Sequence, residues 1–162
     1  MTFIHCPTCG DKLAKKAIGD EGLVPFCTPC NRPHFNYSHP CVICLVIGDT
    51  GEIALIKQKY VSDRFICVAG YVQQSETIES TAKREVEEET GLPVLSIKYI
   101  KSYYHEKGDN LMFGFVCRVQ KSAFNISGEV DEAKWFSVDE AREQLRDGSV
   151  AKRLLEDGIY AL

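Results

Sequence analysis

The acidic side chains of one expected helix, residues 76–90, are of the types and spacing that could bind a metal ion or take part in catalysis. On a helical wheel of about 100° per residue, Val86 and its apolar neighbours mark the face that must pack against the core. Glu85 and Glu89 fall on that same face, and Glu88 lies at its edge. The pattern therefore predicts carboxylates that turn toward the interior of the protein rather than toward solvent.

Buried carboxylates need a compensating positive charge, because burying an unpaired one costs several kcal/mol. A salt-bridged surface helix would explain Glu79 and Glu87, but it does not explain Glu85 and Glu89. Arg84 is adjacent, and a single guanidinium does not neutralise the whole cluster. A hard divalent cation such as Mg²⁺, which prefers oxygen ligands, would resolve the conflict and could activate a water beside a phosphate.

The same residues resemble the signature of the Nudix hydrolase family. Gly70, Glu76 and the run Arg84–Leu92 match the Nudix box at every defined position between residues 70 and 92. The resemblance extends over roughly residues 38–160 and implies an α/β fold, an α/β/α sandwich with a mixed sheet. The box would form a loop, a helix and a second loop within it.

The resemblance also implies roles for single residues. The ligands of Mg²⁺ or Mn²⁺ would be three box carboxylates, the carbonyl of Ala69 and one later acid: Glu85, Glu88, Glu89 and Glu129. Arg84 would orient the carboxylates, and Glu76 would help to hold the loop. The general base would be Glu88 or, as the second candidate, Glu129, for which a surface acid at a strand end is the alternative. The implied reaction is attack of a metal-activated water on the diphosphate linkage of a nucleoside diphosphate derivative.

Two C-x-x-C pairs near the start of the chain predict a structural zinc site. Cys6 and Cys9 are separated by seventeen residues from Cys27 and Cys30, a spacing that lets four thiolates converge on a tetrahedral Zn²⁺. The segment of residues 1–38 is short and poor in aliphatic side chains, so it needs a bound metal ion in place of a hydrophobic core to stabilise its fold. Thiols that pair only by coincidence of spacing are the alternative, and His5 and His34 are neighbouring candidate ligands.

A third C-x-x-C, formed by Cys41 and Cys44, has a different interpretation. It lies in a continuous apolar run that is typical of a buried strand, where positions three apart point to opposite faces. We therefore expect these two cysteines, and likewise Cys67 and Cys117, to be buried as small apolar side chains.

A four-cysteine ribbon before a Nudix domain resembles the NADH pyrophosphatase subgroup. Members of this subgroup carry an aromatic after the box glycine, and Tyr71 occupies that position, where it would stack on a base; an aromatic packed under the loop is the alternative. Their Ser-Gln-Pro-Trp element is reduced to Ser102 within residues 101–107, where Tyr103 could still offer aromatic surface. Ser102 and Tyr103 are therefore candidate substrate-binding residues. An NAD(H)-like dinucleotide is favoured, with ADP-ribose and FAD as alternatives.

Other functions are weighed against this hydrolase. A non-catalytic Nudix ligand-sensing module would usually lack box carboxylates, which are all present here. A net charge of -4 argues against a nucleic-acid partner other than a capped RNA 5′ end. The resemblance suggests a homodimer. With neither a signal peptide nor a long apolar run, the sequence predicts a cytoplasmic protein without a membrane partner.

The elements that position these residues can be placed along the chain. We expect a zinc ribbon over residues 1–38 and the Nudix hydrolase domain over residues 39–162. With 44% hydrophobic residues among 162, the chain can bury a core. The expected strands are 41–47, 52–58, 65–68, 95–104 and 111–119, then the segment 129–136. Helices are expected over 76–90, from the capping box at Ser137 to about Leu145, and over 149–156.

Overall fold

The computed structural model describes residues 3–160 and divides the chain into two compact units, Met1–Ser38 and His39–Leu162. The first unit is a three-stranded antiparallel sheet in which β2 (Leu23–Cys27) lies between β1 (Ala14–Ala17) and β3 (Arg32–Pro33). A single 3-10 turn, η1 (Gly19–Glu21), joins β1 to β2. This unit carries the four predicted zinc ligands, of which Cys27 lies in β2.

The second unit is built on a mixed six-stranded sheet. Five strands run in the order β7 (Val94–His105), β8 (Asn110–Val119), β4 (His39–Gly48), β5 (Ile53–Lys57) and β9 (Glu132–Phe136), and β6 (Val68–Tyr71) pairs with β4. The β4–β8 pair is parallel, and all other pairs are antiparallel. The 3-10 turn η2 (Glu106–Gly108) connects β7 to β8.

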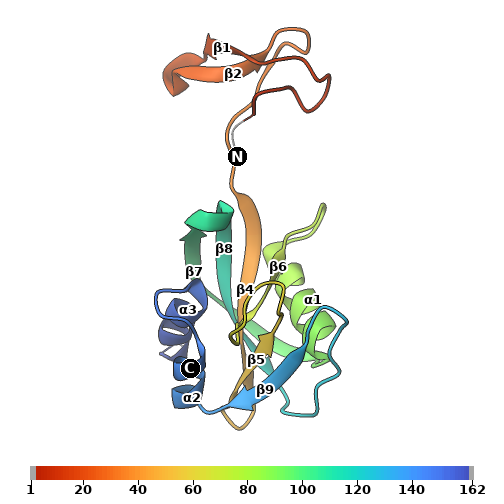
Figure 1. The fold of residues 1–162 in the computed structure, drawn as a ribbon, viewed down its shortest axis with the longest axis vertical. Helices are drawn as coiled ribbons and strands as arrows, with labels where there is room; N and C mark the ends of the chain where they lie inside the picture. Colours follow the sequence, from red (N-terminus) through yellow and green to blue (C-terminus); the bar gives the residue numbers. More distant parts are fainter. Residues whose placement is uncertain (1–2, 161–162) are drawn as a thin grey trace. The chain divides into compact units, whose positions relative to one another are not determined.

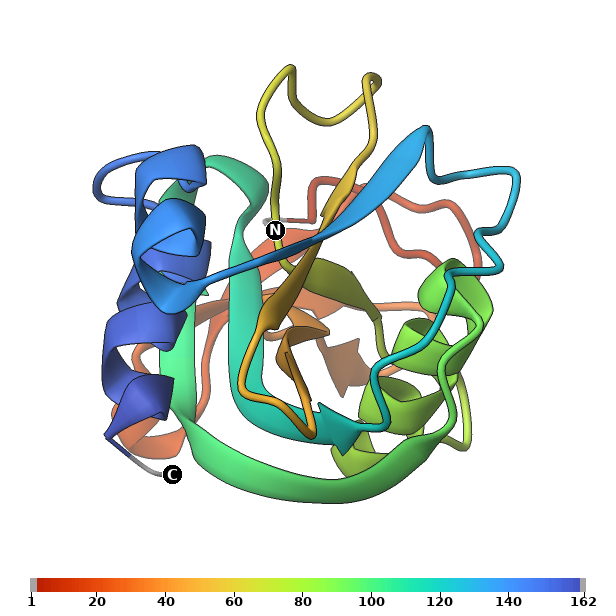
Figure 2. The same ribbon diagram turned by 90° about the horizontal axis from the view of Figure 1, so that it is seen from below.

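Helices cover both faces of this sheet, as Figures 1 and 2 show. The helix α1 (Ile78–Thr90) lies on one side, and α2 (Val138–Gln144) and α3 (Val150–Ile159) lie on the other. The predicted α/β/α sandwich with a mixed sheet is thereby confirmed. None of the helices described within residues 3–160 has the length and apolar character needed to cross a membrane.

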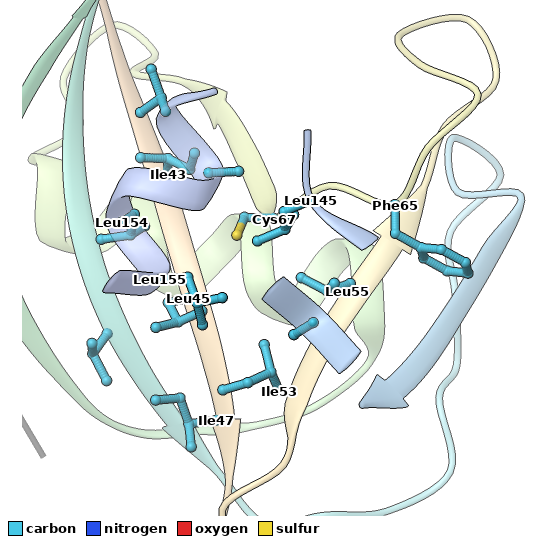
Figure 3. Packing of buried hydrophobic residues seen from close by; sticks show 14 of the residues in the cluster. Ile43, Leu45, Ile47, Ile53, Leu55, Phe65, Cys67, Leu145, Leu154 and Leu155 are labelled. Atoms are coloured by element: carbon cyan, nitrogen blue, oxygen red, sulfur yellow. The ribbon is translucent and has the colours of Figure 1, made fainter. Parts of the chain in front are cut away.

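Alternate residues of β4 feed two separate cores, because successive side chains of a strand point to opposite faces. Leu45 packs with Leu154 and Leu155 of α3 on one face, as Figure 3 shows. On the other face, Cys44 packs with Val86 of α1. The strand is thus buried on both sides, as its continuous apolar run predicts.

The expected burial of the four remaining cysteines is confirmed. All four are at most 4% exposed: Cys41, Cys44, Cys67 and Cys117. Cys44 and Cys117 belong to the core beneath α1, and Cys67 belongs to the core beneath α3. They fill space as small apolar side chains do.

Three predicted elements have a boundary that differs from the structure by three residues. The strand expected over 65–68 is displaced to Val68–Tyr71, where Ala69 and Gly70 pair with β4 although neither residue favours a strand by itself. The segment expected from residue 129 enters the sheet only at Glu132. The last helix continues to Ile159, beyond the expected end at residue 156, because Leu155 and Gly158 are buried on its inner face.

Candidate active site

The helix α1 begins and ends where its local sequence dictates. The side chain of Thr77 accepts a hydrogen bond from the backbone of Ser80, whose side chain in turn accepts one from the backbone of Thr77, which completes a capping box. Gly91 ends the helix in the left-handed conformation, with φ of 70°. These fixed ends set the rotation of the helix, and Val86, which is fully buried, fixes the face that it turns to the sheet.

The rotation of α1 divides its carboxylates as the helical wheel predicts. Glu89 is only 4% exposed, and the side chain of Glu85 is 13% exposed. The side chain of Glu88 is 59% exposed. Two carboxylates therefore face the interior, and Glu88 lies at the edge of the solvent-facing side.

Arg84 is the centre of an ion-pair network. Its Nη1 donates to Glu85 at 2.8 Å and to Glu88 at 3.0 Å. Its Nε and Nη2 donate to the two carboxylate oxygens of Glu76 at 2.7 and 2.9 Å, and this contact lowers the pKa of Glu76 to about 2. Glu76 precedes α1, which begins at Ile78, so the expected start of the helix at residue 76 is wrong and Glu76 belongs to the loop. Through Arg84, the loop before the helix is tied to the carboxylates on it.

Gly70 lies directly against Glu85. A Cβ atom added at Gly70 would sit 1.9 Å from Oε1 and 2.0 Å from the carboxyl carbon of Glu85. Any side chain there would displace the carboxylate. Glycine on this strand leaves room for the carboxylate of Glu85, which would have to move if the position carried a Cβ.

Glu89 is held on one side only. Gln58, itself 5% exposed, donates from Nε2 to Oε1 of Glu89 at 2.6 Å. The second oxygen, Oε2, is buried and has no hydrogen-bond partner among the described residues. Burial raises the pKa of Glu89 to about 7, and the nearby charges of Glu85 and Glu129 act in the same direction.

These observations fit a divalent cation. Burial likewise raises the pKa of Glu85, in spite of Arg84. The buried, unpartnered oxygen of Glu89 is an acceptor for which the chain supplies no donor, and oxygen donors suit Mg²⁺ or Mn²⁺. As the side chains are arranged, Arg84 holds Glu85 and Glu88 through one nitrogen, while Gln58 holds Glu89.

A cavity of about 960 Å³ opens over this site. Its lining includes five of the residues predicted for metal or substrate binding: Ala69, Tyr71, Glu85, Glu89 and Glu129. Tyr71 is 58% exposed, and its ring meets that of His39 edge to face at 6.0 Å between centroids. Glu88 and Ser102 are not among the residues that line the cavity in the described part of the chain.

The prediction that Tyr103 binds substrate is wrong. Tyr103 is 4% exposed and belongs to the core beneath α3. Its hydroxyl donates to Oδ2 of Asp157 at 2.8 Å. The aromatic side chain that this strand contributes to the cavity is instead the next residue, Tyr104, which is 52% exposed.

Sequence reasoning did not identify Gln58 or Tyr60, which line the cavity beside the box. Gln58 is the last residue of a segment expected to be a strand. The alternation of apolar and polar residues along that segment did not indicate that the amide of Gln58 turns inward. Its partner, Glu89, lies 31 positions away. Only the unsatisfied charge on the inner face of α1 indicates that such a polar partner is needed.

The four predicted cysteine ligands meet in the first unit. The Sγ atoms of Cys6, Cys9, Cys27 and Cys30 all lie within 4.8 Å of one another, as they must to share one tetrahedral Zn²⁺. Nε2 of His34 lies 3.5 Å from Sγ of Cys6, so His34 is a neighbour of the cluster and not part of the four-ligand group. Four soft thiolates fit zinc.

The fold and the box together define the class of this protein. The chain belongs to the Nudix family, because the family model of the NUDIX domain matches residues 37–157.

Within the family, the chain is similar in sequence to NAD-capped RNA hydrolases. The chain is 28% identical over 160 residues to the NAD-capped RNA hydrolase NudC of Vibrio vulnificus, and the match covers 98% of this chain and 60% of that protein. It is 30% identical over 157 residues to the human NAD-capped RNA hydrolase NUDT12, with 90% of this chain and 33% of that protein covered. The chain thus spans only part of the length of these curated relatives.

Solved structures support the fold. A Nudix hydrolase from Nitrosomonas europaea superimposes with a TM-score of 0.70 at 19% identity, over 98% of this chain and 93% of that one. The Nudix domain of NrtR from Shewanella oneidensis gives 0.69 at 14% identity, over 78% of this chain and 90% of that one. At these identities the likeness concerns architecture alone.

Proposed function

We propose that this Nudix hydrolase cleaves the diphosphate bond of an NAD-type dinucleotide and that it does so with a divalent cation. The observation that carries the proposal is the cavity of about 960 Å³, which joins the buried carboxylates Glu85 and Glu89 to the exposed aromatic rings of Tyr71 and Tyr104. A dinucleotide presents a diphosphate between two flat bases, and base–aromatic stacking contributes about 1–3 kcal/mol per base.

The cation would be held by Glu85, Glu89 and Glu88, with the carbonyl of Ala69 as a further ligand. When bound, it would polarise phosphate oxygens and lower the pKa of a water. Arg84 is then a positioning residue, because it holds Glu85 and Glu88 through the same nitrogen.

Glu129 is the general base that the geometry favours. It lines the cavity, and its negative charge acts on both Glu85 and Glu89. Glu88 has a mostly exposed side chain that is bound to Arg84 and does not line the cavity in the described residues. A carboxylate of Glu129 would accept the proton of the attacking water while the new P–O bond forms and the bridging P–O bond breaks, which yields two nucleoside monophosphates.

The test is a hydrolysis screen of the zinc-loaded full chain with Mg²⁺ or Mn²⁺. The substrates are NADH, NAD, ADP-ribose and FAD, and the products are identified by chromatography. We expect cleavage of NAD(H) into two monophosphates. Replacing Glu89→Gln should lower kcat/KM on the order of a hundredfold or more, whereas the matched control Glu79→Gln, on the solvent-facing side of α1, should retain it.

The outcomes separate the alternatives. Cleavage of ADP-ribose or FAD without cleavage of NAD(H) would replace the proposed substrate. Tight binding of a nucleotide without turnover of any substrate would favour a ligand-sensing module. A larger loss of kcat/KM in Glu129→Gln than in Glu88→Gln would support the assignment of the base, and the reverse ranking would return that role to Glu88.

A second candidate substrate is NAD at the 5′ end of RNA. It is favoured by one specific finding, namely that the relatives from Vibrio vulnificus and human are NAD-capped RNA hydrolases. A short NAD-capped RNA added to the same screen tests it. Release of nicotinamide mononucleotide from the RNA at a rate comparable to that from free NAD would support it.

A further inference from the structure

The wall of the cavity away from the box helix carries three positive side chains. Lys107 of η2, Arg146 of the loop between α2 and α3, and Arg153 of α3 all line the cavity. Figures 1 and 2 show α2 and α3 on one side of the sheet and α1, with Glu85 and Glu89, on the other, while η2 joins the ends of β7 and β8. The cavity therefore has an acidic wall and a basic wall.

The three cations are not held in ion pairs within residues 3–160, although the charge of Arg153 helps to lower the pKa of Asp157, which is itself paired with Lys101. None of them forms a salt bridge there, and Arg153 instead lies over the ring of Tyr103, 5.4 Å from its centroid. All three side chains are exposed. Their charge is thus available to a ligand in the cavity.

Two acidic residues on the same wall do not cancel this charge. Asp147 lines the cavity, but it is paired with Lys152, which holds its pKa below the usual range. Glu106, next to Lys107, is the other acid of this wall. Three cations against one unpaired carboxylate leave the wall positive.

The aromatic side chains of Tyr71 and Tyr104 line the same cavity. If the diphosphate binds at the acidic wall through the divalent cation, the basic wall is free to meet a different anion, separated from the diphosphate by a nucleoside. On an adenosine, the group in that position is a phosphate on the ribose. Arginine is suited to such a group because its planar donors bind phosphate bidentately.

We propose that Lys107, Arg146 and Arg153 form a subsite for a phosphate on the ribose of the substrate, in addition to its diphosphate. This inference rests on the proposed function, because it places the diphosphate at the box. The shared chemistry has several sources: a 2′-phosphate as in NADP(H), a 3′-phosphate as in coenzyme A, and the 3′-phosphodiester that joins a capping nucleotide to RNA.

The first test measures binding without chemistry. Isothermal titration in Mg²⁺ compares AMP with 2′,5′-ADP and 3′,5′-ADP, which contain no diphosphate bond to cleave. We expect the wild type to bind at least one bisphosphate about tenfold or more tightly than AMP. The preference should disappear in the double variant Arg146→Ala/Arg153→Ala. It should remain for the most part in Arg146→Lys/Arg153→Lys, and Lys83→Ala, a charge removed from the exposed face of α1, is the remote control.

The two bisphosphates also separate the sources. A preference for 2′,5′-ADP points to an NADP-type substrate, and a preference for 3′,5′-ADP points to coenzyme A or an RNA 3′-linkage. Equal affinity of the wild type for AMP and both bisphosphates would overturn the subsite, and so would a preference that survives in the double alanine variant.

The second test uses turnover and distinguishes this inference from the proposed function. The readout is the kcat/KM of a substrate that carries the ribose phosphate divided by the kcat/KM of its counterpart without it. The pairs are NADP with NAD, coenzyme A with dephospho-coenzyme A, and a short NAD-capped RNA with NAD. In the double alanine variant the ratio for the preferred source should fall about tenfold. An equal loss for all substrates would mean that the arginines bind the diphosphate, which overturns the subsite alone. Absence of turnover for every substrate would refute the proposed function, and the titration would still decide the subsite.

Discussion

Replacing Glu89→Gln should change how the stability of the magnesium-free protein depends on pH. Burial raises the pKa of Glu89 from 4.5 to about 7, so the folded protein binds this proton more tightly than the unfolded chain does. The contribution of Glu89 is therefore favourable at low pH and is lost as the pH rises from about 4.5 to about 7. Glutamine has no proton to lose, so the variant should lack this loss.

The magnitude follows from the same difference in pKa. Raising it from 4.5 to about 7 corresponds to about 3 kcal/mol, at about 1.4 kcal/mol per pH unit. Because Glu89 is only 4% exposed, solvent screening reduces this figure little. The amide oxygen of the glutamine keeps the hydrogen bond from Gln58. Its NH₂ group at the position of Oε2 adds a penalty that does not change with pH, so the comparison of slopes is unaffected.

The assay is urea unfolding of the zinc-loaded full chain in chelator-free buffer between pH 5 and pH 8. The single tryptophan, Trp135, lies on β9 and reports the Nudix domain. Glu79→Gln should keep the wild-type slope. Addition of Mg²⁺ at pH 8 should then stabilise the wild type and the Glu79 variant, but not Glu89→Gln. Identical pH slopes for wild type and Glu89→Gln would refute the electrostatic account of this site.

Three further predictions follow from single contacts. Gly70→Ala should abolish Mg²⁺-dependent stabilisation and turnover while the circular dichroism spectrum is kept, because a Cβ would lie 1.9 Å from Oε1 of Glu85. Normal turnover would show that the site does not depend on the close contact between Gly70 and Glu85. Tyr103→Phe should lower the free energy of unfolding by about 1 kcal/mol, through loss of the bond to Asp157, and leave KM unchanged; a KM increase without destabilisation would restore Tyr103 as a substrate contact. Mass spectrometry of the native protein should find one zinc per chain, and Cys27→Ser, at a fully buried ligand position, should lose it and melt the small sheet; full zinc content in that variant would exclude the four-cysteine site.

The local part of the active site was predictable from the sequence. The capping residues and Gly91 fix the ends of α1, and with these ends fixed the 3.6-residue period determines that Glu85 and Glu89 turn inward. Glu76 lies before the helix, where that period does not apply. Its partner, Arg84, is eight residues away, and the contact depends on the path of the loop.

Features that depend on strand register were not predictable in the same way. A β-bulge between Tyr99 and Lys101 shifts the alternation of β7, so the sequence alone did not show that Tyr103 is buried and Tyr104 faces the cavity. The same limit applies to Gln58, whose role depends on a helix 31 residues further along the chain. Periodicity determines which residues share a face, whereas tertiary pairing determines which face meets the site.

The arrangement of charge on α1 explains why the fold is linked to its cofactor. Arg84 already has three carboxylate partners, so it does not compensate Glu89. Core residues such as Ala82 and Val86 hold the helix in the rotation that buries Glu89, and Gly70, which has no Cβ, leaves the space that the carboxylate of Glu85 occupies. The chain therefore gives Glu85 only a share of the charge of Arg84 and supplies no cation for Glu89. A divalent cation held by these carboxylates would relieve their repulsion beside the cavity. We therefore expect the repulsion that destabilises the metal-free fold to be the interaction that favours binding of a divalent metal.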